Sequence, residues 1–103
     1  MVDLSQKEWV EQLKADDNAF VLDVRTQEEF QQGYIPNASN IDIYSGQQFI
    51  SELEKLDKSK SYYVYCRSGA RSRQACNMMR DMGFPKAFNL QGGIMAWEGE
   101  VVH

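Results

Sequence analysis

The sequence has 103 residues, the length of one ordinary domain, with 43% hydrophobic and 25% charged residues. Its net charge of -4 argues against nonspecific binding to nucleic acid or to an anionic membrane, and no apolar run approaches the ~18 residues of a membrane span. The first residues lack the basic and apolar regions of a signal peptide, so we expect a cytoplasmic protein with neither nucleic acid nor membrane as a partner.

The first half of the chain alternates helix and strand patterns. Ser5–Glu8, "SQKE", has the capping-box form that begins a helix. The short apolar run Ala19–Arg25 is typical of a buried strand. A second capping box, Thr26–Glu29, opens a short helix that we expect to end at Gly33. A short strand is expected at Ala38–Ile41, after a Pro-Asn turn.

The second half continues the alternation. Apolar residues at helical spacing predict a helix over Phe49–Leu56. Ser61–Cys66, "SYYVYC", is rich in β-favouring residues and is the clearest strand of the chain. Another apolar helical face follows at Ala75–Met82, then a strand candidate at Lys86–Leu90. The last segment, Gly92–Gly99, is expected to contain a short helix.

The order of these elements predicts the fold class. Strands alternate with helices, and the strands are too apolar to have one face in water, so we expect a small parallel sheet with helices on both faces. Such an α/β fold would occupy residues 1–103 as one domain. Ligands gather at the carboxyl ends of the strands in such sheets. Cys66 lies at the carboxyl end of the clearest strand, just before a helix.

Positive charge is concentrated where this helix begins. Three of the five arginines are Arg67, Arg71 and Arg73. A helix N-terminus already carries roughly half a positive charge, so cations are disfavoured there unless an anion lies among them. Unpaired N–H groups bind anions at such ends, and Gly69 allows successive N–H groups to curve inward as an anion nest. The sequence therefore predicts an anion at this loop.

The anion could be the thiolate of Cys66 or an anionic substrate. Helix N-termini and nearby cations lower a thiol pKa from its ordinary value of ~8.5, and Ser68 and Ser72 can add hydroxyl donors. On this interpretation the arginines make Cys66 a nucleophile. The alternative is that Cys66 is a small buried core residue beside a solvated arginine patch. Cys76 lies within an apolar helical face, where a structural role is expected.

Cysteine count and histidine count limit the other possibilities. Two cysteines do not make a disulfide framework and fit a reducing compartment. The only histidine is the last residue, His103, which argues against a His-dependent triad and a His-rich metal site. We therefore expect no metal centre.

Loop length distinguishes two kinds of cysteine chemistry. Tyrosine phosphatases place five residues between the cysteine and an arginine, whereas four residues separate Cys66 from Arg71. A wide loop suits a tetrahedral phosphate, and a narrower loop suits a single sulfur atom carried on the cysteine. The spacing favours sulfur chemistry over a phosphatase or an arsenate reductase, which stays as the weaker alternative.

Three segments in order resemble one known family. "CRSGARS" resembles the active-site loop of the rhodaneses, a sulfurtransferase family. "LDVRTQEEFQQGYIPNASNI" is similar to that family's first motif, D-V-R-x-x-x-E-[FY]-x-x-G-H-I-P-G-A, and "LQGGIMAW" to its closing L-x-G-G-x-x-A-W. Tyr34 stands where the family usually has His, and Asn37 where it usually has Gly. Both lie outside the loop, so we expect altered packing or an altered acceptor surface rather than lost chemistry.

The resemblance implies a single rhodanese-like domain and a persulfide intermediate on Cys66. Sulfur would pass from a small anionic donor such as thiosulfate, or from a persulfide donor, to a thiol or to cyanide, with no metal or organic cofactor. Residues expected to bind the donor and the persulfide are Arg67, Ser68, Gly69, Ala70, Arg71 and Ser72. The alternative is a sulfur-carrier or binding module that receives a persulfide from a partner protein of a sulfur relay.

Residues near the second predicted strand are candidates for loop support. Asp23 and Arg25 lie at a strand end, and Glu29 follows closely. Either one of these carboxylates pairs with Arg71 and holds the loop, or the group is a solvated helix cap, since Glu29 already completes a capping box. Trp97 is expected to belong to the core rather than to the substrate site.

Overall fold

Five strands form one sheet in the structure, a computed structural model that describes residues 2–103. They are β1 (Val2–Leu4), β2 (Ala19–Asp23), β3 (Ser39–Asn40), β4 (Ser61–Tyr65) and β5 (Ala87–Leu90). Their order across the sheet is β1-β5-β4-β2-β3, and every neighbouring pair is parallel. The predicted parallel α/β fold is confirmed, with all four predicted strands and one that the sequence did not indicate, β1.

The helices confirm the predicted order. They are α1 (Gln6–Ala15), α2 (Gln27–Gln31), α3 (Gln47–Glu54) and α4 (Ala70–Asp81), with 3₁₀ turns η1 (Ile43–Ser45) and η2 (Ile94–Ala96). Both capping boxes are present: the side chains of Ser5 and Thr26 accept hydrogen bonds from the backbone N–H groups of Glu8 and Glu29. The last predicted helix is the single turn η2. No helix in the described part of the chain has the length and apolar character needed to cross a membrane.

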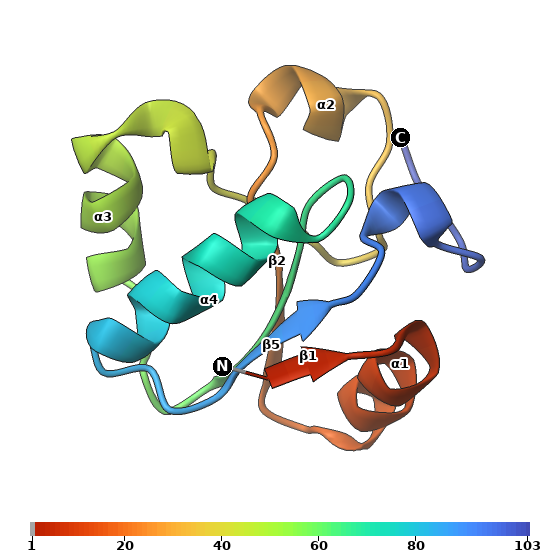
Figure 1. The fold of residues 1–103 in the computed structure, drawn as a ribbon, viewed down its shortest axis with the longest axis horizontal. Helices are drawn as coiled ribbons and strands as arrows, with labels where there is room; N and C mark the ends of the chain where they lie inside the picture. Colours follow the sequence, from red (N-terminus) through yellow and green to blue (C-terminus); the bar gives the residue numbers. More distant parts are fainter. Residues whose placement is uncertain (1) are drawn as a thin grey trace.

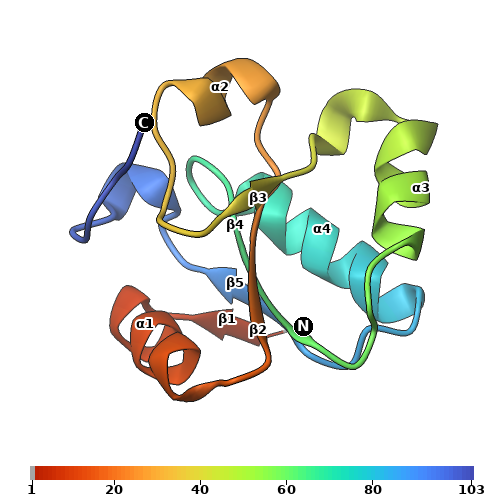
Figure 2. The same cartoon turned by 180° about the vertical axis from the view of Figure 1, so that it is seen from behind.

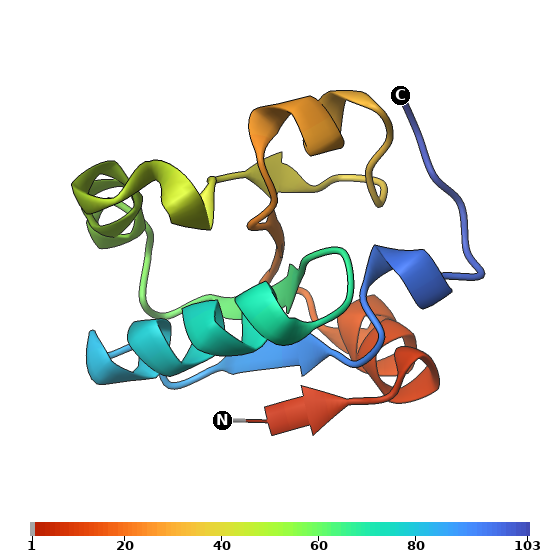
Figure 3. The same cartoon turned by 45° about the horizontal axis from the view of Figure 1, so that its top comes forward.

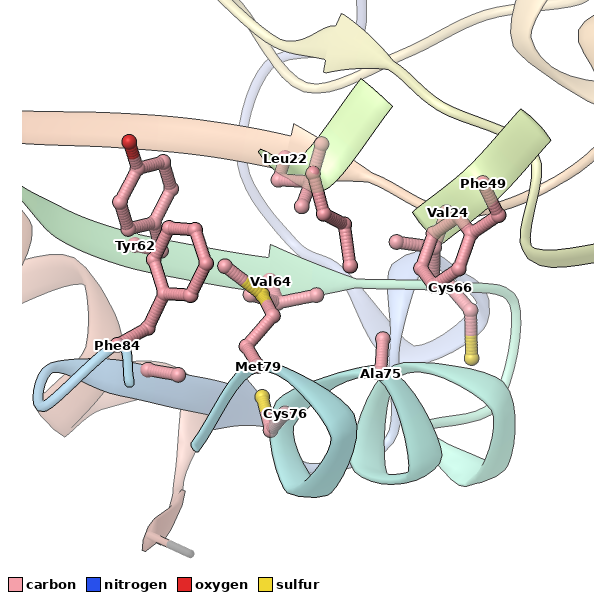
Figure 4. Packing of buried hydrophobic residues seen from close by; sticks show 12 residues of the cluster. Leu22, Val24, Phe49, Tyr62, Val64, Cys66, Ala75, Cys76, Met79 and Phe84 are labelled. Carbon is pink, nitrogen blue, oxygen red and sulfur yellow. The ribbon is translucent and has the colours of Figure 1, made fainter. Parts of the chain in front are cut away.

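The sheet separates two apolar cores, and β4 is buried along its whole length. Successive side chains of a strand point to opposite faces. Tyr62 and Val64 therefore pack with α3 and α4, whereas Tyr63 and Tyr65 pack around Trp9 of α1. Figures 1 and 2 show α4 and α1 on opposite sides of the sheet, and Figure 4 shows the first core. Trp97 packs edge-on against Trp9 at 5.8 Å, in agreement with the expected core role.

The carboxyl ends of the strands lie at the edge of the sheet where Cys66 is found. Figure 3 shows the turn between β4 and α4 at this edge, with α2 and the segment containing η2 on either side of it. The sheet therefore places three segments that are distant in the sequence around Cys66.

Candidate active site

The loop between β4 and α4 surrounds the sulfur of Cys66. Cys66 directly follows β4, and α4 begins at Ala70. Gly69 takes a φ of 107°, a left-handed conformation that favours glycine. Its N–H donates to Cys66 Sγ at 3.1 Å, and the hydroxyl of Ser72 lies 3.4 Å from the same sulfur. The inward-facing donors have the arrangement of an anion nest.

Two opposing effects set the acidity of Cys66. Burial raises the pKa of the thiol, because the side chain is fully buried. Hydrogen bonds from the Ser72 hydroxyl and from the backbone N–H groups of Ser72, Gly69 and Ser68 outweigh burial, so the pKa lies below its ordinary value. The main causes of this lowering are the loop's own donors and not the arginines, to which the sequence analysis assigned the role. Cys66 is thus buried, as the alternative required, and its thiol has a lowered pKa.

Cys76 has the opposite environment. It lies on the α4 face that packs into the first core, where burial raises the pKa of its thiol to about 12. Figure 4 shows the Cys76 sulfur on α4, away from the Cys66 sulfur near the start of that helix. Both cysteines are free thiols. The structural role expected for Cys76 agrees with this position.

Glu29 connects α2 to the loop through Arg71. The Arg71 guanidinium donates to both carboxylate oxygens, at 2.7 and 2.9 Å. Glu29 also accepts the Thr26 N–H at 3.1 Å within the capping box, so both roles considered for this residue hold at once. Hydrogen bonding to Arg71 lowers the pKa of Glu29 to about 2, and the same pair raises the pKa of Arg71. The ring of Tyr44 lies 5.5 Å from the guanidinium carbon and covers it.

Asp23 and Arg25 form a separate buried pair. The Arg25 side chain donates to the Asp23 carboxylate at 2.6 to 3.1 Å and to the Gly33 carbonyl at 2.7 Å. Burial lowers the pKa of Arg25, but the hydrogen bond and charge of Asp23 outweigh it and raise the pKa overall. Asp23 therefore pairs with Arg25 and not with Arg71. The pair fixes the end of the segment that follows α2, whereas Glu29 alone of the three candidates contacts the loop.

The three arginines differ in their partners. Arg73 pairs with Asp3 of β1 at 3.2 Å, and Arg71 pairs with Glu29. For Arg67, which is exposed at the mouth of the loop, the described residues include no carboxylate within ion-pair distance. Two of the three arginines thus pair with carboxylates of the protein itself, and not with the thiolate or substrate anion that the sequence analysis considered. A ligand anion would meet Arg67.

The turn η2 and the glycine before it pack against the back of the loop. The N–H of Ile94 donates to the Cys66 carbonyl at 2.9 Å, and that of Met95 donates to the Arg67 carbonyl at 3.0 Å. Gly93 lies against the backbone of Arg67, and a Cβ atom at Gly93 would be only 2.3 Å from the Arg67 carbonyl oxygen. The sequence analysis did not assign Gly93 to the site. Its signal is the Gly-Gly pair of the closing motif, which marks a close approach of two backbones.

Two other residues near the loop were also missed, Asp3 and Asn89. Asn89 is a buried polar residue on the apolar strand β5, and its amide contacts Asp3, Gly69 and Ser72. A polar residue within an apolar strand is the signal that could have identified Asn89. Asp3 had no such signal, because its strand was not predicted.

The two departures from the family pattern lie away from Cys66. Tyr34 stacks on Phe30 with ring centroids 4.2 Å apart, and its N–H donates to the Val102 carbonyl at 2.9 Å. Asn37 has a φ of 70°, in the left-handed region that glycine and asparagine tolerate best. Tyr34 thus packs on α2 and pairs with the C-terminal segment, and Asn37 fits a backbone that glycine would also occupy; the expected change in packing or acceptor surface stays a prediction.

The mouth of the loop has the features of a small anion site. A shallow pocket beside Arg67 is lined by Arg25, Glu29, Gln32, Gly33, Arg67, Ile94, Met95 and Val101. Among residues 2–103 there is no cluster of three potential metal ligands from His, Cys, Asp and Glu. The site thus combines a buried, hydrogen-bonded sulfur at Cys66 with an exposed cation at the next residue, Arg67.

Comparison with known proteins relates this chain to one family. The Rhodanese-like domain family matches residues 6–100. YtwF of Bacillus subtilis, which carries the provisional name of a sulfurtransferase, is 42% identical over 90 residues, covering 87% of this chain and 84% of that protein. A sulfurtransferase of Allochromatium vinosum is 38% identical over 98 residues, covering 94% and 89%.

Solved structures and longer relatives agree with this match. A rhodanese-like domain protein from Staphylococcus aureus superimposes with a TM-score of 0.82 at 32% identity, over 97% of this chain and 94% of that one. The domain also occurs within longer proteins. YrkF of Bacillus subtilis, provisionally named a sulfur carrier, is 30% identical over 51% of its length. A tRNA uridine(34) hydroxylase of Chlamydia caviae is 32% identical over 30% of its length.

Proposed function

Since this chain belongs to the rhodanese-like domain family, we propose that it is a sulfurtransferase whose Cys66 carries the transferred sulfur as a persulfide. One observation carries the proposal: the Cys66 sulfur accepts hydrogen bonds from the loop that encloses it, including the Gly69 N–H at 3.1 Å. These donors favour the thiolate, which is the nucleophilic form of cysteine.

The first half of the reaction loads the sulfur. The Cys66 thiolate attacks the outer sulfur of thiosulfate, a new S–S bond forms, and sulfite leaves with the electron pair of the broken S–S bond. A persulfide donor reacts in the same way and releases its thiolate. Negative charge moves from Sγ to the outer sulfur, where N–H groups of the loop and Arg67 can stabilise it.

The second half of the reaction transfers the sulfur from Cys66 to an acceptor. An acceptor thiolate, or cyanide in a test tube, attacks the outer sulfur and releases Cys66 as the thiolate, so the enzyme returns to its starting state. The acceptor leaves as a persulfide or as thiocyanate. We place the reaction in the cytoplasm, where thiols that can accept sulfur stay reduced.

Intact-mass measurement tests the proposal directly. Thiosulfate should leave the protein one sulfur atom heavier, and a thiol should reverse the gain. Cys66→Ala should abolish the gain, because the hydrogen-bonded nucleophile is lost. Cys76→Ala is the matched control and should still load, since Cys76 is buried in the core with a raised thiol pKa. Loading that depends on Cys76 instead would overturn the choice of nucleophile.

A carrier function is the second candidate, because one relative at 30% identity is provisionally named a sulfur carrier. The carrier would use the same Cys66 persulfide but take sulfur from a partner protein. Loading rates separate the two functions. Faster loading from thiosulfate than from a persulfidated cysteine desulfurase indicates the enzyme, and the reverse order indicates the carrier.

Loop length argues against the weaker alternative, a phosphatase or an arsenate reductase. The four residues between Cys66 and Arg71 curl closely around one sulfur atom, with Gly69 N at 3.1 Å, whereas a phosphate needs a wider ring of N–H groups. We expect no measurable Cys66-dependent hydrolysis of aryl phosphates. Hydrolysis at a rate comparable to sulfur transfer would contradict this argument.

A further inference from the structure

A chain of buried hydrogen bonds leads from the edge strand β1 to the Cys66 sulfur. The Asn89 amide donates from Nδ2 to Asp3 Oδ1 at 2.8 Å. Its Oδ1 accepts from the hydroxyl of Ser72, and the Ser72 oxygen lies 3.4 Å from Cys66 Sγ. Cys66 and Ser72 are fully buried and Asn89 is 1% exposed, so no bulk water competes for these groups.

The orientation of the Asn89 amide is fixed by its donors. Its NH₂ group contacts two acceptors, the carboxylate of Asp3 and the carbonyl of Gly69, the latter at 3.2 Å. A flipped amide would place its oxygen against both of these acceptors, which is unfavourable. Oδ1 must therefore face Ser72, and Asn89 offers Ser72 only an acceptor.

Ser72 has one hydroxyl proton and three acceptors within reach. They are Asn89 Oδ1, the Gly69 carbonyl at 3.2 Å and Cys66 Sγ. When Cys66 is a thiol, Ser72 can donate to Asn89 while its oxygen accepts the S–H proton. When Cys66 is a thiolate, the best use of the proton is a bond to the sulfur, but that leaves the buried Asn89 oxygen without this donor, which is costly.

We propose that Asn89 is a positioning residue that competes with the Cys66 sulfur for the Ser72 proton. The inference rests on the proposed function and assigns a role for Asn89 in it. A thiolate that is stabilised too strongly is a poor nucleophile. Asn89 limits this stabilisation.

The same competition favours the loading step. As the Sγ–S bond forms and sulfite leaves, negative charge moves from Sγ to the outer sulfur. The Ser72 hydroxyl then turns back to Asn89. No proton is lost or gained, and one O–H group only rotates.

The pH dependence of Cys66 alkylation tests the proposal, with modification at Cys66 quantified by peptide mass. Ser72→Ala removes a donor to the sulfur, so the Cys66 pKa should rise by about 0.5–1. Asn89→Leu, similar in volume but without an acceptor, frees the Ser72 proton for the thiolate. The Cys66 pKa should fall by about the same amount, and the plateau rate at high pH should drop about 2- to 3-fold because the thiolate is less nucleophilic.

A double-mutant cycle separates this role from a structural one. If Asn89 acts through Ser72, Asn89→Leu should have no further effect on the Cys66 pKa in the Ser72→Ala background. A loosened loop would instead raise the pKa in both backgrounds. A rise, or no change, with Asn89→Leu alone overturns the proposal. Circular dichroism checks that the Asn89→Leu variant is folded. If it is not, Asn89→Ala replaces it.

Alkylation requires no sulfur donor, so its outcome is independent of the proposed function. If the parent protein gains sulfur neither from thiosulfate nor from a persulfide donor, while Asn89→Leu lowers the Cys66 pKa, the sulfurtransferase proposal is refuted and the competition stands. If the parent protein loads sulfur normally but Asn89→Leu raises the Cys66 pKa, the competition is refuted and the sulfurtransferase proposal stands.

Discussion

Arg67 and Arg71 carry the same charge in different surroundings. Arg67 is exposed and lies beside the pocket at the loop mouth, whereas Arg71 is held by Glu29 and covered by Tyr44. We expect Arg67→Ala to raise the KM for thiosulfate by roughly 10- to 150-fold, the loss of one charge-assisted contact. A neutral persulfide donor should be affected less. Arg71→Ala should slow turnover with every donor and raise the Cys66 pKa, because the loop loses its attachment to α2.

Steady-state rates with thiosulfate and with a neutral persulfide donor, together with the pH profile of Cys66 alkylation, test these different roles of Arg67 and Arg71. Arg80→Ala is the matched control, since it removes the same charge from the last turn of α4. Equal, donor-independent losses in the first two variants would leave only a shared electrostatic role.

The Glu29–Arg71 pair predicts acid sensitivity. The pKa of Glu29 falls from 4.5 to about 2 on folding, so the folded state favours the ionised carboxylate. The stabilisation is fully present above pH 4.5 and is lost as the pH falls toward 2. Glu29→Gln should lower the free energy of unfolding at neutral pH by about 1–3 kcal/mol. Between pH 4.5 and 2 it should lose less stability than the parent protein.

Urea unfolding across this pH range measures the effect. Glu28→Gln removes the same charge from an exposed neighbour and is the control. Parallel pH profiles for Glu29→Gln and the parent would show that the pair contributes nothing to acid sensitivity.

At the scale of elements, the approach of the η2 segment to the loop depends on one glycine. Gly93 and Gly46 have similar left-handed φ values, 59° and 64°. A Cβ at Gly93 would meet the Arg67 carbonyl at 2.3 Å, whereas a Cβ at Gly46 would meet nothing within 4 Å. Gly46→Ala should therefore cost only the backbone strain, about 1–3 kcal/mol.

Gly93→Ala should cost more than Gly46→Ala, because two backbones must separate. It should also slow Cys66 alkylation and sulfur loading, since the displaced carbonyls belong to the loop. Thermal unfolding and loading rates of the two variants measure the difference. Equal stability and unchanged loading in both would mean that the loop does not depend on this contact.

Local signals explain which elements the sequence could predict. The two capping boxes and the apolar run of β4 are determined by neighbouring residues, so the starts of α1 and α2 and both ends of the central strand were predicted to within a residue. The helices α3 and α4 have no side-chain cap, and their observed starts lie two and five residues before the predicted apolar faces. β1 has only three residues and gains its stability from pairing with β5, 86 residues away at Val2 and Phe88. Contacts between distant segments were likewise not predictable at the site. Cys66 and its loop could be predicted from one segment, but the contacts of Asn89 and Asp3 depend on the register of two distant strands.

At the scale of the whole molecule, the two cores share one sheet and should unfold together. Every side chain of β4 is buried, and its two faces belong to different cores. A domain of this size is expected to unfold in one cooperative step. Cys76, fully buried in the first core with a thiol pKa of about 12, should therefore react with a thiol reagent only after global unfolding.

A Cys66→Ala variant, in which Cys76 is the only thiol, allows this to be measured. The rate of Cys76 labelling in rising urea should follow the unfolded fraction reported by tryptophan fluorescence. Rapid labelling well below the unfolding transition would show that the first core opens independently of the second.

Residues of the loop and of the first turn of α4 differ in exposure: some are buried and others face solvent. Cys66, Gly69 and Ser72 are buried, whereas Arg67, Ser68 and Ala70 are exposed. The inner three residues hold the sulfur, and the backbone of the loop is fixed from behind by η2. The outer three can therefore change with little effect on the nucleophile. A scaffold of this kind can evolve toward new sulfur donors by surface substitutions, while its core and its reaction stay the same.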